Sequence, residues 1–439
     1  MLKITFLGAG STVFARSVLG DCMSSEALRD CEIALYDIDA QRLKESEKIL
    51  TAINKGKGGY SIITTYTGLE NLEKALKGAY FAVNAIQVGG YDPATIADFE
   101  IPKKYGLRQT IGDTLGIGGI MRALRTIPVM EHFARAMEKV CPDAWLLNYT
   151  NPMSMLTGFM LTHTGVKTVG LCHSVQVCSQ HLLESLGMAD KLEGRKELIA
   201  GINHMGWLLD IRDKNNIDLY PEIKKRAKEK NAKEKHWDMV RYDYIDKLGY
   251  YCTESSEHNA EYNPFYIKSK YPDLISRFNI PLDEYPRRCI EQIEGWKSEF
   301  ESLSKSDTLE HKRSHEYASY IMESIVTGNP YKIGGNVLNR GSIENLPYEA
   351  CVEVPCLVDN SGIRACYAGK LPVHLAAMNM THINVHLITI EAAHTKKRDH
   401  IYHAAMLEPH TAAELSLDDI KKMTDELLEA HKKWLPEYK

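Results

Sequence analysis

The sequence predicts an α/β protein, with an N-terminal doubly wound parallel sheet and a C-terminal mixed α/β domain. Over the first ~175 residues, short apolar and β-branched runs alternate with helical patterns, which is typical of a parallel sheet covered by helices on both faces. After that the alternation stops, and paired strands and long helices are expected instead. We therefore predict two domains, spanning residues 1–195 and 196–439.

The first element has the pattern of a nucleotide-binding turn. Residues 3–7 indicate a strand, Gly-Ala-Gly-Ser follows, and a helical pattern begins near Val13, which takes the place of the usual third glycine. One glycine allows a tight turn, and the other lets a pyrophosphate approach the backbone because no Cβ intervenes. The N–H groups of the helix N-terminus would then face the phosphates. The residues predicted to bind a cofactor here are Gly8, Gly10, Ser11 and Thr12.

The second predicted strand, residues 32–36, ends at Asp37. A carboxylate at this position can accept both ribose hydroxyls of an adenosine, and it repels a 2′-phosphate. The alternative is an aspartate that only closes a turn. Because strand, glycine loop, helix, strand and acid occur in this order, we predict that the domain binds NAD⁺.

The remaining elements of the first half continue the alternation. Helices are expected around residues 43–53, 69–76 and 121–140, and a further one starts at Pro152. The segment Gln109–Ile120 is too rich in glycine to be predicted as helix. Further strands are expected at residues 61–65, 80–85, 144–148 and 167–171.

The second half has a different pattern. Lys224–Lys235 is predicted to be a solvated helix face, and residues 254–262 form a dense polar cluster in an expected loop. Strands are expected at residues 197–202, 207–211, 331–338 and 351–358, and helices near 236–248, 286–304, 312–326, 372–395 and 416–433.

Composition excludes several functional classes. The 439 residues are 25% charged and 44% hydrophobic with a net charge of −5, so neither a nucleic-acid nor a membrane partner is indicated. The ten cysteines show no spacing framework. The first strand leaves no room for a signal peptide, and no apolar run is long enough to span a bilayer. We expect a cytoplasmic protein with reduced thiols.

Three loops that follow predicted parallel strands carry polar side chains. Gln87 follows one strand, Asn148 and Asn151 the next, and Cys172 and His173 the last. The carboxyl ends of parallel strands meet at one edge, so these loops are expected to converge near the nicotinamide of a bound cofactor. In the alternative interpretation the asparagines cap the next helix and Cys172 fills the core.

The local sequence leaves the roles of two other residues open. Asp113, in the glycine-rich segment, is either an ordinary helix N-terminal acid or a proton donor in a cleft. His204 has the same ambiguity, and a lone histidine is more often a hydrogen-bonded structural residue.

Several motifs occur in order along the chain: Gly8-Ala9-Gly10-Ser11-Thr12, Ile111-Gly112-Asp113-Thr114-Leu115-Gly116, Asn148-Tyr149-Thr150-Asn151-Pro152, Gly170-Leu171-Cys172-His173-Ser174-Val175, Gly201-Ile202-Asn203-His204-Met205 and Val352-Glu353-Val354-Pro355. Together they resemble glycoside hydrolase family 4 over the whole length, and within it the α-galactosidases that hydrolyse melibiose. The resemblance implies a fold like that of lactate and malate dehydrogenases, with NAD⁺ and a divalent metal, commonly Mn²⁺, as cofactors.

The resemblance also assigns roles. Cys172 and His204 correspond to the metal ligands, Asp113 to the acid and Tyr262 to the base. The substrate-binding residues are Asn148, Asn151 and His173, and Gln87 joins the cofactor site. The implied reaction takes hydride from C3 of the sugar, removes the C2 proton, eliminates the aglycone, adds water and returns the hydride. The two flanking carboxylates that most glycosidases need have no part in it.

The expected substrate is an unphosphorylated α-galactoside such as melibiose or raffinose. Residues 89–99 contain no arginine or lysine to hold a 6-phosphate, and Cys-His-Ser-Val resembles the α-galactosidase signature. The alternatives are an α-glucosidase of the same family, a lactate/malate-type dehydrogenase and a non-catalytic NAD sensor. A homodimer or homotetramer is expected.

Overall fold

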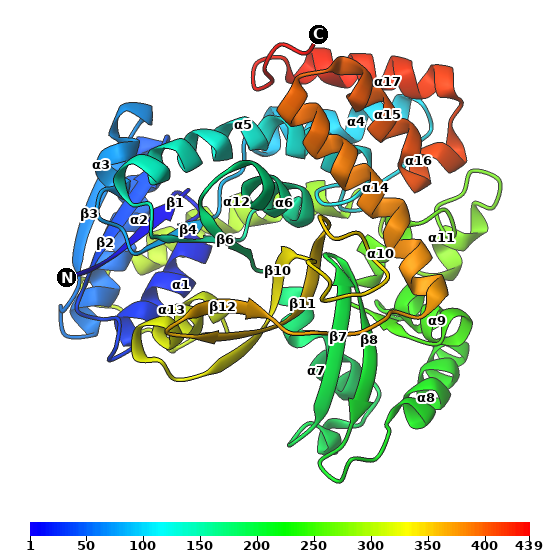
Figure 1. Cartoon of the computed structure of the whole chain (residues 1–439), viewed down its shortest axis with the longest axis horizontal. Coiled ribbons are helices and arrows are strands. Elements are labelled where there is room, and N and C mark those ends of the chain that lie inside the picture. Colours follow the sequence, from blue (N-terminus) through cyan, green and yellow to red (C-terminus); the bar gives the residue numbers. More distant parts are fainter.

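A twelve-stranded sheet runs through the whole computed structural model, which describes residues 1–439 (Figure 1). Its first six strands are parallel in the order β3-β2-β1-β4-β5-β6, which confirms the predicted doubly wound sheet. The strands are β1 (Leu2–Leu7), β2 (Cys31–Asp37), β3 (Ile62–Thr67), β4 (Phe81–Asn84), β5 (Trp145–Asn148) and β6 (Lys167–Gly170). The helices between them are α1 (Thr12–Ser24), α2 (Ala40–Gly56), α3 (Leu72–Leu76), α4 (Ile96–Lys104), α5 (Gly116–Val140), α6 (Met153–His163) and α7 (His173–Ser185).

The second half extends this sheet with antiparallel strands, in the order β10-β11-β7-β8-β9 after β6. They are β7 (Lys196–Ile202), β8 (Met205–Arg212), β9 (Tyr251–Cys252), β10 (Tyr331–Leu338) and β11 (Cys351–Asp359), with β12 (Gly362–Ala365) paired to β11. The predicted pairing of residues 197–202 with 207–211 is confirmed. The sheet is continuous across the predicted domain boundary at residues 195 and 196, and that boundary stays a prediction.

The helices of the second half lie around the antiparallel strands and above the parallel ones (Figure 1). Helices α14, α15 and α17 pack with α5 and α6, so the C-terminal chain closes one face of the N-terminal sheet. The full set is α8 (Tyr220–Lys233), α9 (Met239–Leu248), α10 (Ser256–Tyr262), α11 (Asp273–Arg277), α12 (Glu284–Leu303), α13 (Tyr317–Thr327), α14 (Val373–Thr395), α15 (Arg398–Leu407), α16 (Pro409–Glu414) and α17 (Leu417–His431).

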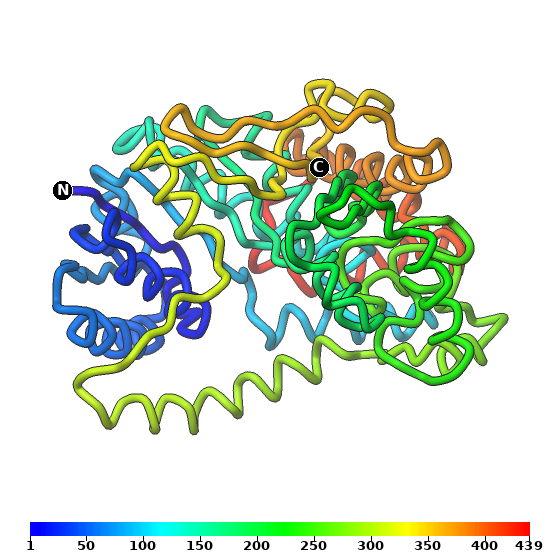
Figure 2. Tube along the Cα trace, turned by 90° about the horizontal axis from the view of Figure 1, so that it is seen from below, coloured from blue at the N-terminus to red at the C-terminus, as the bar shows by residue number.

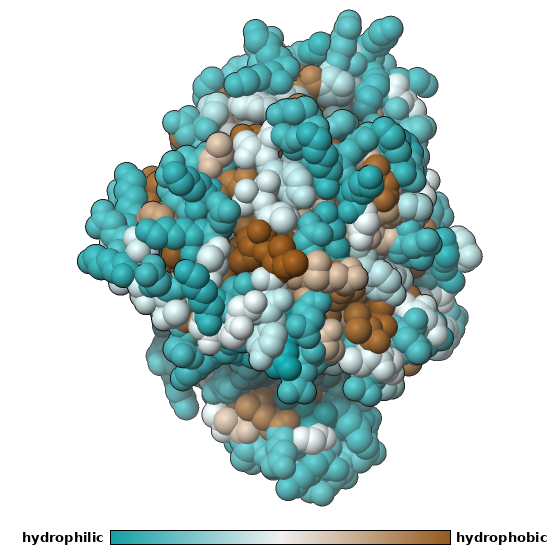
Figure 3. All heavy atoms as spheres, turned by 90° about the vertical axis from the view of Figure 1, so that its left-hand side faces the viewer, coloured by the Kyte–Doolittle hydropathy of each residue, from teal (hydrophilic) through white to brown (hydrophobic).

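Helix α12 runs along the outside of the molecule, from the second half back to the N-terminal sheet (Figure 2). Its far end is attached there by two contacts, Glu299 with Arg16 at 2.7 Å and Trp296 Nε1 with Glu45 at 2.9 Å. The end of the molecule formed by β3 is largely hydrophilic, with small separate apolar spots (Figure 3). No helix has the length and apolar character needed to cross a membrane.

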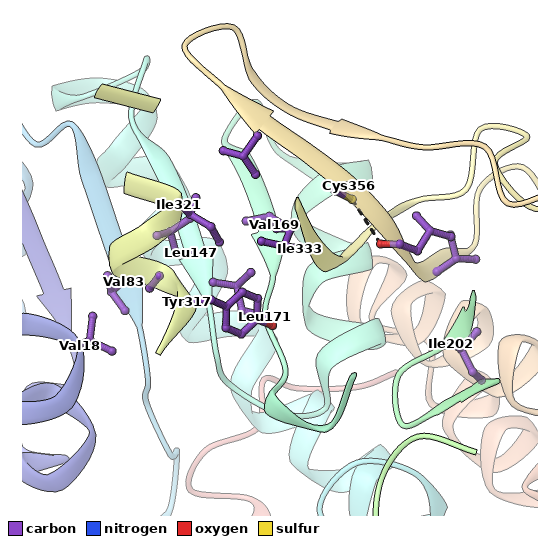
Figure 4. Packing of buried hydrophobic residues seen from close by; sticks show 14 of the residues in the cluster. Val18, Val83, Leu147, Val169, Leu171, Ile202, Tyr317, Ile321, Ile333 and Cys356 are labelled. Carbon is purple, nitrogen blue, oxygen red and sulfur yellow. Dashed lines mark hydrogen bonds between the residues drawn. The ribbon is translucent and has the colours of Figure 1, made fainter. Parts of the chain in front are cut away.

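The core joins the two halves. A cluster of 51 buried residues extends from the parallel strands to β10 and β11. Val83, Leu147 and Val169 of the parallel sheet lie beside Tyr317 and Ile321 of α13, which covers this face together with α1 (Figure 4). The halves therefore share one hydrophobic core, which holds the loops at their junction in fixed positions.

Two expectations about local structure are wrong. Helix α5 begins at Gly116, inside the glycine-rich segment, because its first turns pack directly against the preceding loop. A Cβ on Gly118 would lie 2.3 Å from the carbonyl oxygen of Gly112. Residues 256–262 form helix α10 and not a loop; six of its seven residues are buried, so it shows no amphipathic stripe.

Candidate active site

A cavity of about 340 Å³, partly open to solvent, lies at the carboxyl ends of β4, β5 and β6. As predicted, the loops after these strands converge there and contribute Gln87, Asn151, Cys172 and His173. The cavity also reaches Ser11 at the start of α1. One continuous space therefore extends from the glycine turn to the loops of the second half.

The glycine turn fits a dinucleotide. Gly8 has a φ of +87°, and a Cβ there would lie 2.8 Å from the carbonyl oxygen of Ala85. No side chain caps the N-terminus of α1 at Ser11, so its first N–H groups are free to bind an anion. Thr12 is buried and faces inward, where its hydroxyl contacts that of Ser46 at 2.9 Å, so it supports the turn from behind.

Asp37 lies against the glycine turn. One of its oxygens accepts the Gly10 N–H at 2.7 Å, and the other accepts the N–H of Asp39 at 2.9 Å. These bonds fix the carboxylate beside the start of α1, and each oxygen retains a lone pair that a ribose hydroxyl can use. Gln87 donates to Thr95 at 3.4 Å and lines the cavity.

Cys172 and His204 are brought together although they come from opposite halves of the chain. Their ligand atoms and a carboxylate oxygen of Glu254 all lie within 4.8 Å of one another. His204 Nε2 is 3.4 Å from Glu254 Oε2, which is close to the separation of about 3–3.5 Å expected for two ligands of one ion. Thiolate, imidazole and carboxylate donors together fit a divalent first-row metal.

Negative charge surrounds His204. Burial lowers the pKa of the imidazole, but the nearby Cys172 and Glu254 outweigh it and raise that pKa to about 10. Burial likewise opposes ionisation of Glu254, yet His258 and His204 bring its pKa down to about 2. A divalent cation can supply the positive charge that this group of side chains favours.

Glu254 was expected from the sequence only as part of a polar cluster. It has a φ of +62°, in the left-handed region that a side chain other than glycine rarely adopts. Such backbone strain, which costs roughly 1 kcal/mol or more, is concentrated at functional sites. The run Glu254-Ser255-Ser256-Glu257-His258 was the one available signal, and nothing in it selected this acid from its neighbours.

Asp113 is buried next to the cavity residue Asn151 and is not itself among the residues that line the cavity. Thr114 donates its hydroxyl to one Asp113 oxygen at 2.8 Å, and the Asn151 amide donates to the other at 3.3 Å. Asn151 lines the cavity, and its side-chain oxygen is buried without a hydrogen-bond partner, so one acceptor of this residue is unused. Asn148, in contrast, is fully buried, and its amide is engaged by Asn84, Thr150 and Thr157. The structure does not bring Asn148 to the cavity.

His173 lies at the open side of the cavity. Its Nε2 contacts the Glu316 carboxylate at 2.7 Å. Burial lowers the pKa of His173, but the Glu316 contact outweighs it and the net pKa is raised.

Tyr262 is completely buried and lies directly behind His204. Its hydroxyl is 3.1 Å from His204 Nδ1, and it is not among the residues that line the cavity. The adjacent Glu261 accepts N–H groups of the Asp113 loop, from Thr110 at 2.7 Å and Gly112 at 2.8 Å. The tyrosine thus supports the imidazole, and Glu261 holds the loop that carries Asp113.

Two cavity residues could not be identified from the sequence. His258 on α10 lines the cavity, and its Nδ1 contacts the Ser255 hydroxyl at 2.7 Å. Arg122 on α5 also lines it, with NH1 3.4 Å from the Tyr285 hydroxyl and a buried Nε that has no partner. The segment 89–99 lacks a cation, but the cavity does not, because α5 turns Arg122 inward.

The sequence matches two family models, described as family 4 glycosyl hydrolase over residues 3–188 and as its C-terminal domain over residues 199–411. The chain belongs to glycoside hydrolase family 4. This family 4 hydrolase is 58% identical to an α-galactosidase of Bacillus subtilis, over all of both chains. It is 35% identical to an α-galactosidase of Rhizobium meliloti, over 99% of this chain and 89% of the relative.

The fold is shared with solved structures of related sequence. A 6-phospho-α-glucosidase from gut microorganisms, in complex with NAD and Mn²⁺, superposes on the family 4 hydrolase over the full length of both chains, with a TM-score of 0.83 and 20% identity. The family assignment makes the chain a glycosidase, and it disfavours the dehydrogenase and sensor alternatives.

Proposed function

We propose that this glycosidase hydrolyses unphosphorylated α-galactosides and uses NAD⁺ and a divalent metal ion. The metal ion we propose is Mn²⁺. The observation that carries the substrate class is the full-length similarity, at 58% identity, to an α-galactosidase. The cofactors are supported by the glycine turn with Asp37 and by the group Cys172, His204 and Glu254. Cytoplasmic location and a homodimer or homotetramer stay predictions.

In this proposal, different residues of the chain bind NAD⁺ and the metal ion. Ser11 and the free N–H groups of α1 hold the pyrophosphate of NAD⁺, and Asp37 holds the adenosine ribose. Cys172, His204 and Glu254 hold the metal. When bound, the two cofactors would supply hydride acceptance and polarisation of an oxygen at C3, which acidifies the C2 hydrogen.

Two residues are proposed as candidates for the base that takes the C2 proton. Tyr262 is the base implied by family resemblance, and it lies against His204 with its hydroxyl buried. His258 faces the cavity directly. Asp113, held by Thr114 and Asn151, is the proposed acid that protonates the leaving oxygen.

The substrate class is tested by comparing p-nitrophenyl α-galactoside, α-glucoside and their 6-phosphates, each with NAD⁺ and Mn²⁺ at equal concentrations. We expect the α-galactoside to have the highest kcat/KM, by roughly tenfold or more over the α-glucoside. The comparison includes the 6-phosphates because Arg122, a cation, lines the cavity. A higher kcat/KM for either 6-phosphate would contradict the proposed substrate and point to Arg122 as an anion ligand.

A further inference from the structure

We propose that Glu353, through Asn336 and Asn203, is a positioning residue that sets the distance between Cys172 and His204. The proposal rests on the metal site of the proposed function. Glu353 lies on β11, is completely buried and is not among the residues that line the cavity. It therefore acts on the site only through the residues it contacts.

One oxygen of Glu353 connects two strands that approach the site from opposite sides. Its Oε1 accepts the side-chain amide of Asn203 at 3.2 Å and that of Asn336 at 3.0 Å. The Asn336 amide also donates to the carbonyl oxygen of Gly170 at 3.3 Å. A chain of hydrogen bonds thus runs from the end of β6, through Glu353, to the end of β7.

This network spans two narrow pairings of the sheet, the one that joins the antiparallel part to the parallel part and one within the antiparallel part. Strand β10 pairs with β6 through the single residue pair Asn336 and Gly170. Strand β11 pairs with β7 through the single pair Glu353 and Gly201. Cys172 closely follows the end of β6, and His204 closely follows the end of β7. Both junctions are thus the points from which the two proposed ligands project.

The backbone leaves little room for movement at these points. A Cβ on Gly170 would lie 2.6 Å from Thr157 Oγ1 and 2.8 Å from Asn336 Cβ. A Cβ on Gly201 would lie 2.7 Å from the carbonyl oxygen of Met205. The backbone at both points is therefore tightly packed. We expect a change in the hydrogen bonds that Glu353 accepts from the two asparagine amides to shift the backbone before Cys172 and His204, and so the two ligands themselves.

A carboxyl group is costly at a position with only a structural role. Glu353 Oε2 is buried without a hydrogen-bond partner, and it lies beside Gly206. Burying a polar oxygen without a partner destabilises the folded protein, and an apolar residue would avoid this cost. The two amides that Glu353 Oε1 accepts explain why this position holds a side chain with an oxygen acceptor and not an apolar residue.

The test measures Mn²⁺ affinity of the metal-free full-length protein by electron paramagnetic resonance of free Mn²⁺, independently of turnover. Glu353→Ala is expected to weaken Mn²⁺ binding by roughly 10- to 100-fold, as removal of such supporting contacts typically does. Glu353→Gln keeps an acceptor for both amides and should stay within about threefold of wild type. Asn203→Ala is the second variant, for use if Glu353→Ala does not fold. It removes only one of the two donors and should also weaken Mn²⁺ binding.

Val354→Ala is the matched control, because Val354 follows on β11 and is 1% exposed but has no side-chain hydrogen bond to the network. It should destabilise the fold without changing Mn²⁺ affinity. Wild-type affinity in folded Glu353→Ala or Asn203→Ala, or an equal loss in Glu353→Gln or Val354→Ala, would overturn the positioning role. Failure of the wild-type protein to bind Mn²⁺ would instead overturn the metal site itself, and this inference with it.

Discussion

Replacing Cys172 by serine is expected to lower turnover of an α-galactoside by roughly 10³-fold or more and to weaken Mn²⁺ binding strongly. The physical reason is that a thiolate is lost from a group of three donor side chains, and Lewis-acid polarisation is worth several kcal/mol. The measurement is Mn²⁺ affinity and kcat/KM in the presence of NAD⁺. His204→Ala should behave in the same way, because it removes the partner from the other half of the chain.

The matched control is Cys178→Ser, the same substitution on α7 at a buried position outside the cavity. It should keep both Mn²⁺ affinity and turnover. Full turnover of Cys172→Ser in the presence of a chelator would contradict the assignment of Cys172 as a ligand.

Replacing Asp113 by asparagine is expected to lower kcat/KM for melibiose by roughly 10²- to 10⁴-fold, the range for loss of a general acid. An activated p-nitrophenyl α-galactoside should lose much less, because its leaving group departs without protonation. The fold should be preserved, since Asn keeps an oxygen for the Thr114 hydroxyl and the unpartnered Asn151 oxygen can accept its amide. An equal loss on both substrates would contradict a role as leaving-group acid.

Much of the site could be predicted because parallel strands deliver their following loops to one edge. Gln87, Asn151 and Cys172 were placed by this rule alone, and the structure brings them to one cavity. Asn148 was misplaced by the same rule, because the last residue of β5 points into the protein, where its amide is fully bonded. A side chain's direction at a strand end depends on register, which the sequence does not state.

Other features depend on contacts between distant segments. Arg122 lies within the expected helix of residues 121–140, but every residue of α5 from Ile117 to Ile127 is buried, so no amphipathic pattern shows which side faces the cavity. The two sheet halves are joined by a single residue pair at Gly170, and β7 joins β11 by another at Gly201; no periodicity in the sequence signals either pair. Helix α10 was missed because its buried polar residues, including Glu261, resemble a loop in sequence.

The central claim is that the glycosidic bond is broken after a proton leaves C2, and this is tested most directly by hydrolysis of melibiose in D₂O with NAD⁺ and Mn²⁺. The account predicts galactose with deuterium at C2, and no net formation of NADH, because each hydride removed is returned. Tyr262→Phe and His258→Gln, compared in the same assay, show which residue takes the proton. If the wild-type enzyme hydrolyses melibiose in D₂O and the galactose carries no deuterium at C2, the account is contradicted.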